Sequence, residues 1–317
     1  MTVAPTAPYS RPVDDLFPEP PIPDQKILIG TSGYSFPDWV GPFYPRGMKS
    51  SDFLTYYARH FPCVEVNSTY YGIPRPRVME LMEKKTPEGF RFIVKLHQSM
   101  THDRSLEPAT RREFLAAIEP LKDAGKYEGL LGQFPWAFRH TPDSLAYLDA
   151  LREALPDEPL FVEFRHRSWA SPEVEPWLRQ RRLGFCAVDE PQMDALMPPT
   201  TMVTAQDAYV RFHGRNASAW WSRDEEAARH GPQASTDFEL RPPEPRAADA
   251  PRGGERQLLR YDYDYTKQEL AEWMTRIREL ADKARRTYLF FNNCHAGQAA
   301  RSAKLMQELV RQQTLGS

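Results

Sequence analysis

The chain has 317 residues, and its 41 lysines and arginines nearly balance 43 aspartates and glutamates, giving a net charge of −2. This balance excludes a strongly basic nucleic-acid binder at the level of the whole chain, so nucleic acid is not an expected partner. Hydrophobic residues make up 41%, enough for a sizeable core, and no apolar run is long enough to span a membrane. The three cysteines form no CxxC pair and the first residues lack a signal-peptide pattern. These features predict a cytoplasmic protein without membrane association.

Proline is over-represented, with 30 residues, and two segments hold many of them. Residues 1–25 contain seven prolines and no hydrophobic period, which predicts an extended, disordered leader. Residues 218–258 contain five prolines, six arginines and eight acidic residues. Because the charges cancel, we interpret this stretch as a solvated loop insertion, and a lid over a site is the alternative. The remainder, residues 26–317, is predicted to form one domain.

Between these segments, short apolar or β-branched runs alternate with longer helical patterns. Eight such runs predict strands: Lys26–Ile29, Cys63–Val66, Phe90–Leu96, Gly129–Phe134, Leu160–Phe164, Gly184–Val188, Ala208–Phe212 and Thr287–Phe291. Strands separated by helices are parallel, and eight of them close a (β/α)8 barrel of the TIM type. An open doubly wound sheet is the alternative, but the turn Gly30–Gly33 lacks its G-x-G-x-x-G pattern.

Several of the intervening segments carry helix start signals. Thr110 with Glu113, and Thr266 with Glu269, have the spacing of a capping box. Thr141 precedes Pro142, which predicts an N-cap followed by proline in the first helical position. After Thr266, one predicted helical face is apolar and should pack on the sheet: Leu270, Trp273, Ile277, Leu280 and Ala284.

Polar residues gather where the predicted strands end, which is where barrel enzymes place their chemistry. They are Glu65, Asn67, Lys95, His97, Gln133, Glu163, Arg165, Asp189, Arg211, His213, Asn292 and Asn293. Strand residues two apart point the same way, so several of these form pairs on one face. If that face lines the barrel, the charged groups converge on one mouth. Salt bridges that fill the mouth without doing chemistry are the alternative explanation.

Several ordered motifs make the sequence similar to a known family. They include Ile29–Tyr34 (IGTSGY), Val64–Ser68 (VEVNS), Gln133–Pro135 (QFP), Glu163–Trp169 (EFRHRSW), Tyr209–Gly214 (YVRFHG) and Phe291–Asn293 (FNN). Over residues 26–312 the chain resembles the domain-of-unknown-function 72 (YecE-like) family. The resemblance implies a TIM-type barrel and leaves the reaction open. It also indicates two departures, a tyrosine at position 34 where tryptophan is expected and a longer segment between Gly214 and Tyr261.

The residue types at the strand ends favour acid–base chemistry on a small anionic or sugar-like substrate, of hydrolase or lyase type. Glu65 and Glu163 are the candidate catalytic carboxylates, each suited to act as a base or a nucleophile, and His213 is the candidate proton donor, with His97 as the alternative. Cations beside them would keep the glutamates ionised and hold an anion. The predicted substrate-binding residues are Trp39, Asn67, Tyr70, Lys95, Gln133, Arg165, Arg211 and Asn292. For the aromatic members of this set, ordinary packing is an equally good explanation.

Two alternatives stay open at this point. The first is a divalent-metal enzyme acting on a sugar or nucleic-acid phosphate, with ligands drawn from Glu65, Glu163, Asp189, His213 and His295. Against it, the sequence has no tight ligand motif, and interleaved Arg and Lys would repel a cation, so we predict no cofactor. The second alternative is a barrel that binds a ligand without catalysis. The oligomeric state cannot be read from the sequence.

Overall fold

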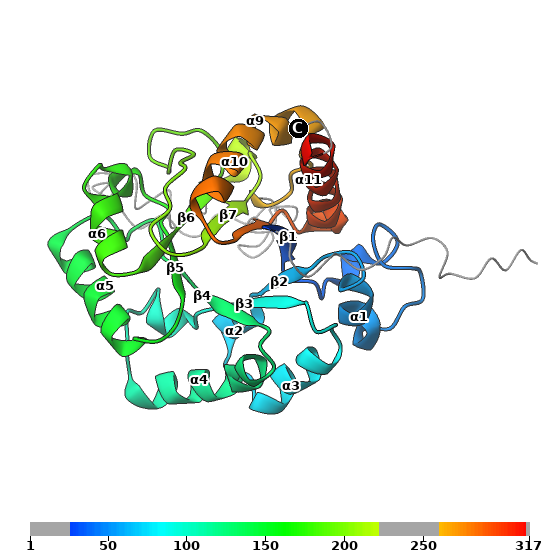
Figure 1. Cartoon of the computed structure of the whole chain (residues 1–317), viewed down its shortest axis with the longest axis horizontal. Helices are drawn as coiled ribbons and strands as arrows, with labels where there is room; N and C mark the ends of the chain where they lie inside the picture. The colour runs from blue at the N-terminus through cyan, green and yellow to red at the C-terminus, as the bar shows by residue number, and fades with distance from the viewer. Residues whose placement is uncertain (1–25, 222–259, 315–317) are drawn as a thin grey trace, which may run out of the picture.

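Eight parallel strands close into a barrel in the order of the sequence (Figure 1). The computed structural model describes residues 26–221 and 260–314. The predicted TIM-type barrel is confirmed. The predicted leader lies outside the described residues. Most of the predicted insertion also lies outside the described residues. Only its start is described, which comprises the end of the 3-10 helix η6 (Ala217–Ala219) and the two tryptophans after it.

The strands match the predicted apolar runs closely. They are β1 (Ile27–Ser32), β2 (Cys63–Val66), β3 (Arg91–Lys95), β4 (Tyr127–Gln133), β5 (Leu160–Glu163), β6 (Leu183–Asp189), β7 (Ala208–Phe212) and β8 (Thr287–Phe291). The closing pair, β1 with β8, is in register from Ile27 opposite Thr287 to Thr31 opposite Phe291. Strands buried on both faces need continuous apolar runs rather than alternation, which is why these runs could be recognised.

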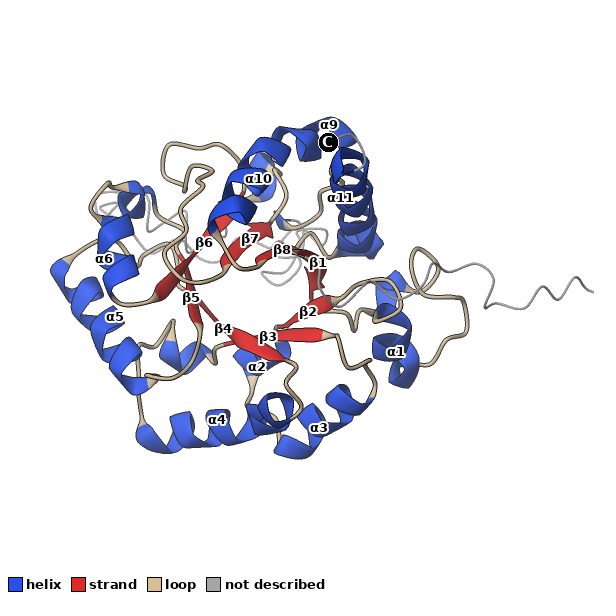
Figure 2. Cartoon of the chain, viewed as in Figure 1, coloured by secondary structure: helices blue, strands red, loops and turns tan. Residues whose placement is uncertain are grey.

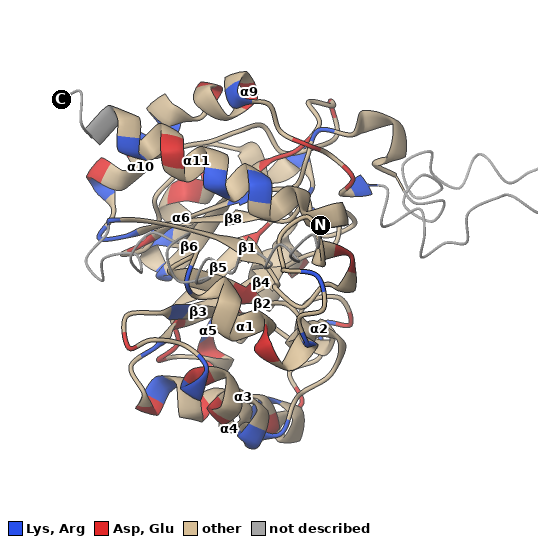
Figure 3. Cartoon of the chain, turned by 90° about the vertical axis from the view of Figure 1, so that its right-hand side faces the viewer, with Lys and Arg blue, Asp and Glu red and all other residues tan. Residues whose placement is uncertain are grey.

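Helices surround the ring of strands (Figure 2). They are α1 (Phe53–Tyr57), α2 (Ser68–Tyr71), α3 (Pro76–Lys84), α4 (Pro108–Asp123), α5 (Pro142–Ala154), α6 (Val174–Gln180), α9 (Lys267–Glu272), α10 (Met274–Lys283) and α11 (Gln298–Thr314). Charged residues of both signs are interspersed on the outer helices (Figure 3). In the described part of the chain, no helix combines the length and apolar character needed to cross a membrane.

The helix start signals were only partly correct. Thr266 and Glu269 form the predicted capping box, and Thr141 caps α5 through the amide of Ser144. Thr110 does not cap a helix, because Pro108 occupies the first position of α4 and the helix begins before Thr110. All five predicted apolar residues after Thr266 are buried, although Trp273 separates α9 from α10.

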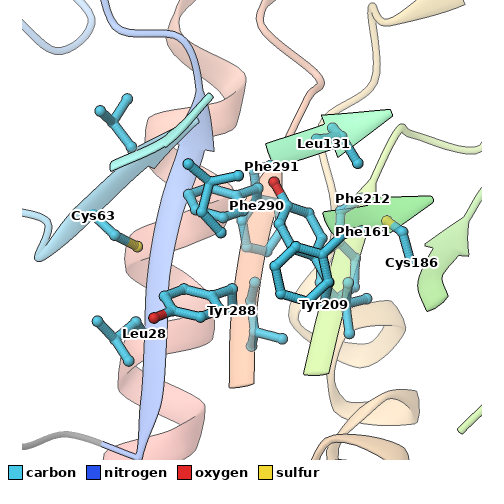
Figure 4. Close-up of a cluster of buried hydrophobic side chains, with 14 of the residues drawn as sticks. Leu28, Cys63, Leu131, Phe161, Cys186, Tyr209, Phe212, Tyr288, Phe290 and Phe291 are labelled. Carbon is cyan, nitrogen blue, oxygen red and sulfur yellow. The ribbon is translucent and has the colours of Figure 1, made fainter. Parts of the chain in front are cut away.

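Side chains from alternate positions fill the barrel interior (Figure 4). Phe161 and Tyr209 lie with their ring centroids 4.9 Å apart, and Tyr209 also packs on Phe290 at 5.2 Å. Small residues make room for these rings: a Cβ on Gly184 would lie 2.4 Å from the Phe161 ring. Burying each large apolar side chain contributes about 1.5–3 kcal/mol. The interior is therefore a packed core, and polar groups are placed above it.

Candidate active site at the barrel mouth

Arg211 joins the two predicted catalytic carboxylates. Its Nη2 lies 2.7 Å from Glu65 Oε1, and its Nη1 lies 2.7 Å from Glu163 Oε2. Tyr209, two residues earlier on β7, donates its hydroxyl to the other oxygen of Glu65 at 2.5 Å. Alternation along β7 explains this, because residues two apart share the inward face. The structure thus places Glu65, Glu163 and Arg211 in one cluster, as the sequence predicted.

Arg165 extends this cluster toward β6. Its Nε lies 2.7 Å from Glu163 Oε1, and its Nη1 lies 3.2 Å from Glu190 Oε2. Burial would raise the pKa of Glu163, but Arg165 and Arg211 outweigh it and hold that pKa well below its ordinary value. Burial dominates for Glu190, whose pKa is raised to about 8 although Arg165 lies beside it. The mouth therefore contains one firmly ionised carboxylate and one that holds a proton near neutral pH.

His213 lies under the mouth and is completely buried. Its Nδ1 lies 3.0 Å from the amide nitrogen of Asn292, and its Nε2 lies 3.3 Å from Glu163 Oε1. With the Asn292 amide donating to Nδ1, the ring proton sits on Nε2 and faces the Glu163 carboxylate. Burial, with Arg165 nearby, lowers the pKa of His213 to about 3. The imidazole is therefore neutral at pH 7.

Lys95 differs from the two arginines of the mouth in the groups that it contacts. Its Nζ donates to Gln133 Oε1 at 2.8 Å and lies 4.5 Å from the centroid of the Tyr70 ring. Within the described residues it has no carboxylate oxygen within 4 Å, whereas both arginines have two carboxylate partners. Its side chain stays partly exposed. Burial of the amine, reinforced by Arg211, lowers its pKa to about 7.

Aromatic rings stand around these charged groups. Trp220 lies over Arg165, with its centroid 5.9 Å from the guanidinium carbon, and 6.4 Å from the His213 ring. Tyr261 lies 6.0 Å from the same imidazole on another side. Tyr70 packs at 5.0 Å against Tyr71, whose residue is 78% exposed. We call Tyr70, Tyr71, Trp220 and Tyr261 the aromatic rim.

Some predicted residues lie away from the cluster. Trp39 is fully buried, packs on Tyr44 and donates its Nε1 to the Cys294 carbonyl at 2.7 Å, so its contacts are those of packing. Asp189 points to the helices, where it accepts from Arg215, Tyr265 and Trp273. The Asn293 amide donates to the Tyr263 carbonyl at 2.8 Å.

Two further predicted residues flank the site. Asn67 follows β2 and precedes α2, and its buried Oδ1 accepts no hydrogen bond from the described part of the chain. His97 caps a short 3-10 turn after β3, with Nδ1 2.9 Å from the Ser99 hydroxyl. His97 is therefore fixed locally, whereas the Asn67 acceptor has no such partner.

The five residues proposed as metal ligands in the alternative hypothesis do not all come together. Asp189 is held on the outer side of β6, and half-exposed His295 is 4.0 Å from Asp262. Across residues 26–221 and 260–314, no group of three His, Cys, Asp or Glu side chains is arranged to hold a metal ion. Glu65 and Glu163 are instead occupied by Arg211.

Sequence reasoning did not select several members of the site, among them Glu190, Tyr209, Trp220 and Tyr261. Glu190 follows Asp189 and points into the barrel. Cys186 on β6 also points inward, because its Sγ lies 3.8 Å from Glu163 Oε2. Counting in twos from Cys186 would have selected Glu190. Tyr209 is visible by the same rule, two residues before Arg211. Trp220 carries no such signal, because it follows an irregular loop.

A closed eight-stranded parallel barrel with charged groups at the carboxyl ends of its strands defines the class of (β/α)8 proteins. Within that class, residues 28–316 match the family described as "Protein of unknown function DUF72". The chain belongs to this family, as its sequence motifs indicated.

Relatives of known name and structure agree with this membership. The chain is 32% identical over 303 residues to the UPF0759 protein YunF of Bacillus subtilis, a match covering 90% of this chain and 94% of YunF. It is 33% identical to the UPF0759 protein YecE of Escherichia coli K12, covering 59% of this chain and 74% of YecE. A crystal structure of a DUF72 family protein from Thermotoga maritima is 35% identical, with a TM-score of 0.73, covering 90% of this chain and all of that one.

Proposed function

We propose that this protein is an enzyme that carries out acid–base chemistry, of hydrolase or lyase type, on a small anionic or sugar-like molecule at the barrel mouth. The observation that carries this proposal is the uneven pairing of the cations. Arg165 and Arg211 each have two carboxylate partners, whereas partly exposed Lys95 has an amide oxygen and an aromatic face. An anionic group of a ligand would supply the missing partner.

The buried charges also support a functional explanation. Glu65 and Glu163 are fully buried, and Arg211 is 1% exposed. Removing such ions from water costs several kcal/mol each, and apolar residues of similar volume usually stabilise a fold at least as well. A buried ionic cluster is therefore weak support for stability and better support for a site.

The protonation states of these side chains suggest the role that each would have in the proposed chemistry. Ionised Glu163 suits a base or an electrostatic stabiliser, as predicted from the sequence. Neutral His213 does not suit the predicted role of proton donor, so we assign it to positioning Glu163 through its Nε2 proton. Lys95 and Glu190, with pKa values of about 7 and about 8, are the groups that exchange protons near neutral pH. Gln133 and Asn67 would orient the substrate, and the aromatic rim would cover a ring.

Thermal denaturation tests the binding step of this proposal. Inorganic phosphate, glucose 6-phosphate and glucose would each be added to the purified protein, to K95M and to K84M. Lys84 is an exposed lysine on α3 that pairs with Glu80, so it serves as the matched control. We expect the anions to raise the melting temperature of the wild type and K84M but not of K95M, since a ligand that binds the native state stabilises it. Equal shifts in K95M would contradict the proposal.

Two further measurements address the alternatives. NMR would be used to monitor whether the stabilising ligand is converted into a product. Conversion would distinguish an enzyme from a barrel that only binds the ligand. Metal analysis of the purified protein tests the divalent-metal alternative, which would be supported by a stoichiometric ion. The cytoplasmic location predicted from the sequence stays a prediction.

A further inference from the structure

We propose that Lys95 is a covalent catalyst, and that its amine forms an imine with the carbonyl group of a small anionic aldehyde or ketone. This inference rests on the proposed function, because it concerns the same mouth, and it names the substrate class. It assigns Lys95 a bond-forming role in addition to holding charge.

The position of the amine supports the inference. Lys95 is the last residue of β3, so its side chain rises from a rigid strand into the mouth. The residue as a whole is partly exposed, although its amine is buried. The amine lies beside two partners that do not neutralise it, the Gln133 amide oxygen at 2.8 Å and the face of the Tyr70 ring. A carboxylate at that distance would hold the ammonium form and suppress its reactivity.

The environment also supplies the reactive form. Burial and the nearby positive charge of Arg211 lower the pKa of Lys95 to about 7. A free amine is the nucleophile in imine formation, and an ordinary lysine, with a pKa near 10.4, is almost entirely protonated at pH 7. The share of neutral amine at Lys95 is thus roughly a thousand-fold larger than at an exposed lysine.

The proposed step balances without any further reagent. The nitrogen lone pair attacks the carbonyl carbon, and one proton passes from nitrogen to the former carbonyl oxygen to give a carbinolamine. The hydroxyl group then leaves as water, taking one more proton from solvent, and a protonated imine remains. Hydrolysis reverses both steps.

Other lysines of the chain serve as internal controls. Lys84 is exposed and pairs with Glu80 at 2.5 Å. Lys126 is buried like a core residue, but its Nζ lies 2.9 Å from Glu83 Oε1 and donates to the Thr86 carbonyl at 2.8 Å. Lys84 therefore controls for access, and Lys126 controls for burial of an amine that has a carboxylate partner.

Reductive trapping tests the proposal on the full chain. The protein would be treated at pH 7 with glyoxylate and cyanoborohydride, which delivers hydride to an imine carbon and leaves a stable secondary amine. Peptide mapping by mass spectrometry then locates the adduct, and separates it from labelling of the α-amino group. We expect Lys95 to be modified at least about ten-fold faster than Lys84 and Lys126, with a rate that rises through pH 7. Comparable labelling of all three lysines would overturn the inference.

Formaldehyde and a second variant separate the covalent role from the charge. Formaldehyde carries no charge, so preferential labelling of Lys95 by formaldehyde but not by glyoxylate would overturn the anionic part of the substrate class. K95R keeps the charge but forms no imine. We expect K95R to retain the thermal shift with phosphate and to lose the adduct. If the wild type shows the thermal shift without an adduct, the imine fails and the proposed function stands. If phosphate, glucose 6-phosphate and glyoxylate all leave the melting temperature unchanged, the proposed function itself fails.

Discussion

Asp189 and Glu190 are consecutive residues whose side chains lie on opposite sides of the barrel wall. Asp189 Oδ1 accepts the Tyr265 hydroxyl at 2.6 Å on the side of the helices, whereas Glu190 Oε2 faces Arg165 at 3.2 Å in the mouth. Each carboxylate is nearly or fully buried, yet the first connects a strand to the outer layer and the second belongs to the site. Substitutions at the two positions should therefore have different consequences.

Replacing Asp189 should weaken the fold and leave the mouth intact. D189N removes a negative charge that accepts hydrogen bonds from Arg215, Tyr265 and Trp273, so we expect a loss of about 2–4 kcal/mol in the free energy of unfolding. Urea denaturation measures this loss, with D149N as a control because Asp149 is a partly exposed partner of Arg181. Anion-induced thermal shifts should persist in D189N, and their disappearance would mean that Asp189 serves the site.

Replacing Glu190 should change how stability depends on pH. Because the pKa of Glu190 is raised from 4.5 to about 8, the native state binds more protons than the unfolded state between these values. The contribution of Glu190 to the free energy of unfolding is therefore complete below pH 4.5, and it is lost as the pH rises from 4.5 through about 8. Relative to E190Q, the wild type should lose up to about 1.4 kcal/mol per pH unit within that window.

Urea denaturation at pH 5, 6.5 and 8 gives this difference directly. The variant E175Q is the control, since Glu175 is an exposed residue paired with Arg179. Parallel pH profiles for the wild type and E190Q would show that Glu190 titrates normally in the native state.

Removing the central guanidinium should be costly. R211M leaves Glu65 and Glu163 buried without the cation that both of them contact at 2.7 Å. Loss of one partner from a buried ionic cluster costs about 3–5 kcal/mol, whereas the exposed pair of Arg179 and Glu175 contributes less than about 1 kcal/mol. Chemical denaturation of R211M and R179M compares the two, and similar midpoints for both would contradict a tightly coupled cluster.

Gly30 tests the packing beneath the site. A Cβ at this position would lie 2.2 Å from the backbone oxygen of Cys63 on the neighbouring strand β2, so the strands would have to separate. We expect G30A to destabilise the protein by about 1–3 kcal/mol or more. G72A is the control, because a Cβ on Gly72 meets no atom within 4 Å. Equal melting temperatures for the two variants would show that β1 and β2 can move apart freely.

The sequence revealed the barrel more completely than the site. Buried parallel strands need continuous apolar runs, so all eight strands could be predicted, and the spacing of residues placed Glu65, Glu163 and Arg211 at one mouth. The contacts of Arg211 with both glutamates were not predicted, because they depend on distances across the closed barrel. The outward direction of Asp189 follows from the alternation of side chains along β6, but its contact with Trp273, 84 residues later in the chain, could not be predicted from its position. The low pKa of His213 likewise depends on burial and on Arg165, which come together only in the folded barrel.

Trp220 and Tyr261 lie at 6.4 Å and 6.0 Å from the ring of the same residue, His213. The two ends of the segment between them are thus fixed at one point of the mouth. The entropy of closing a chain between fixed ends grows only with the logarithm of its length, so doubling the segment costs about 0.6 kcal/mol. A longer or shorter segment between these two residues is therefore compatible with an unaltered arrangement of the side chains at the mouth.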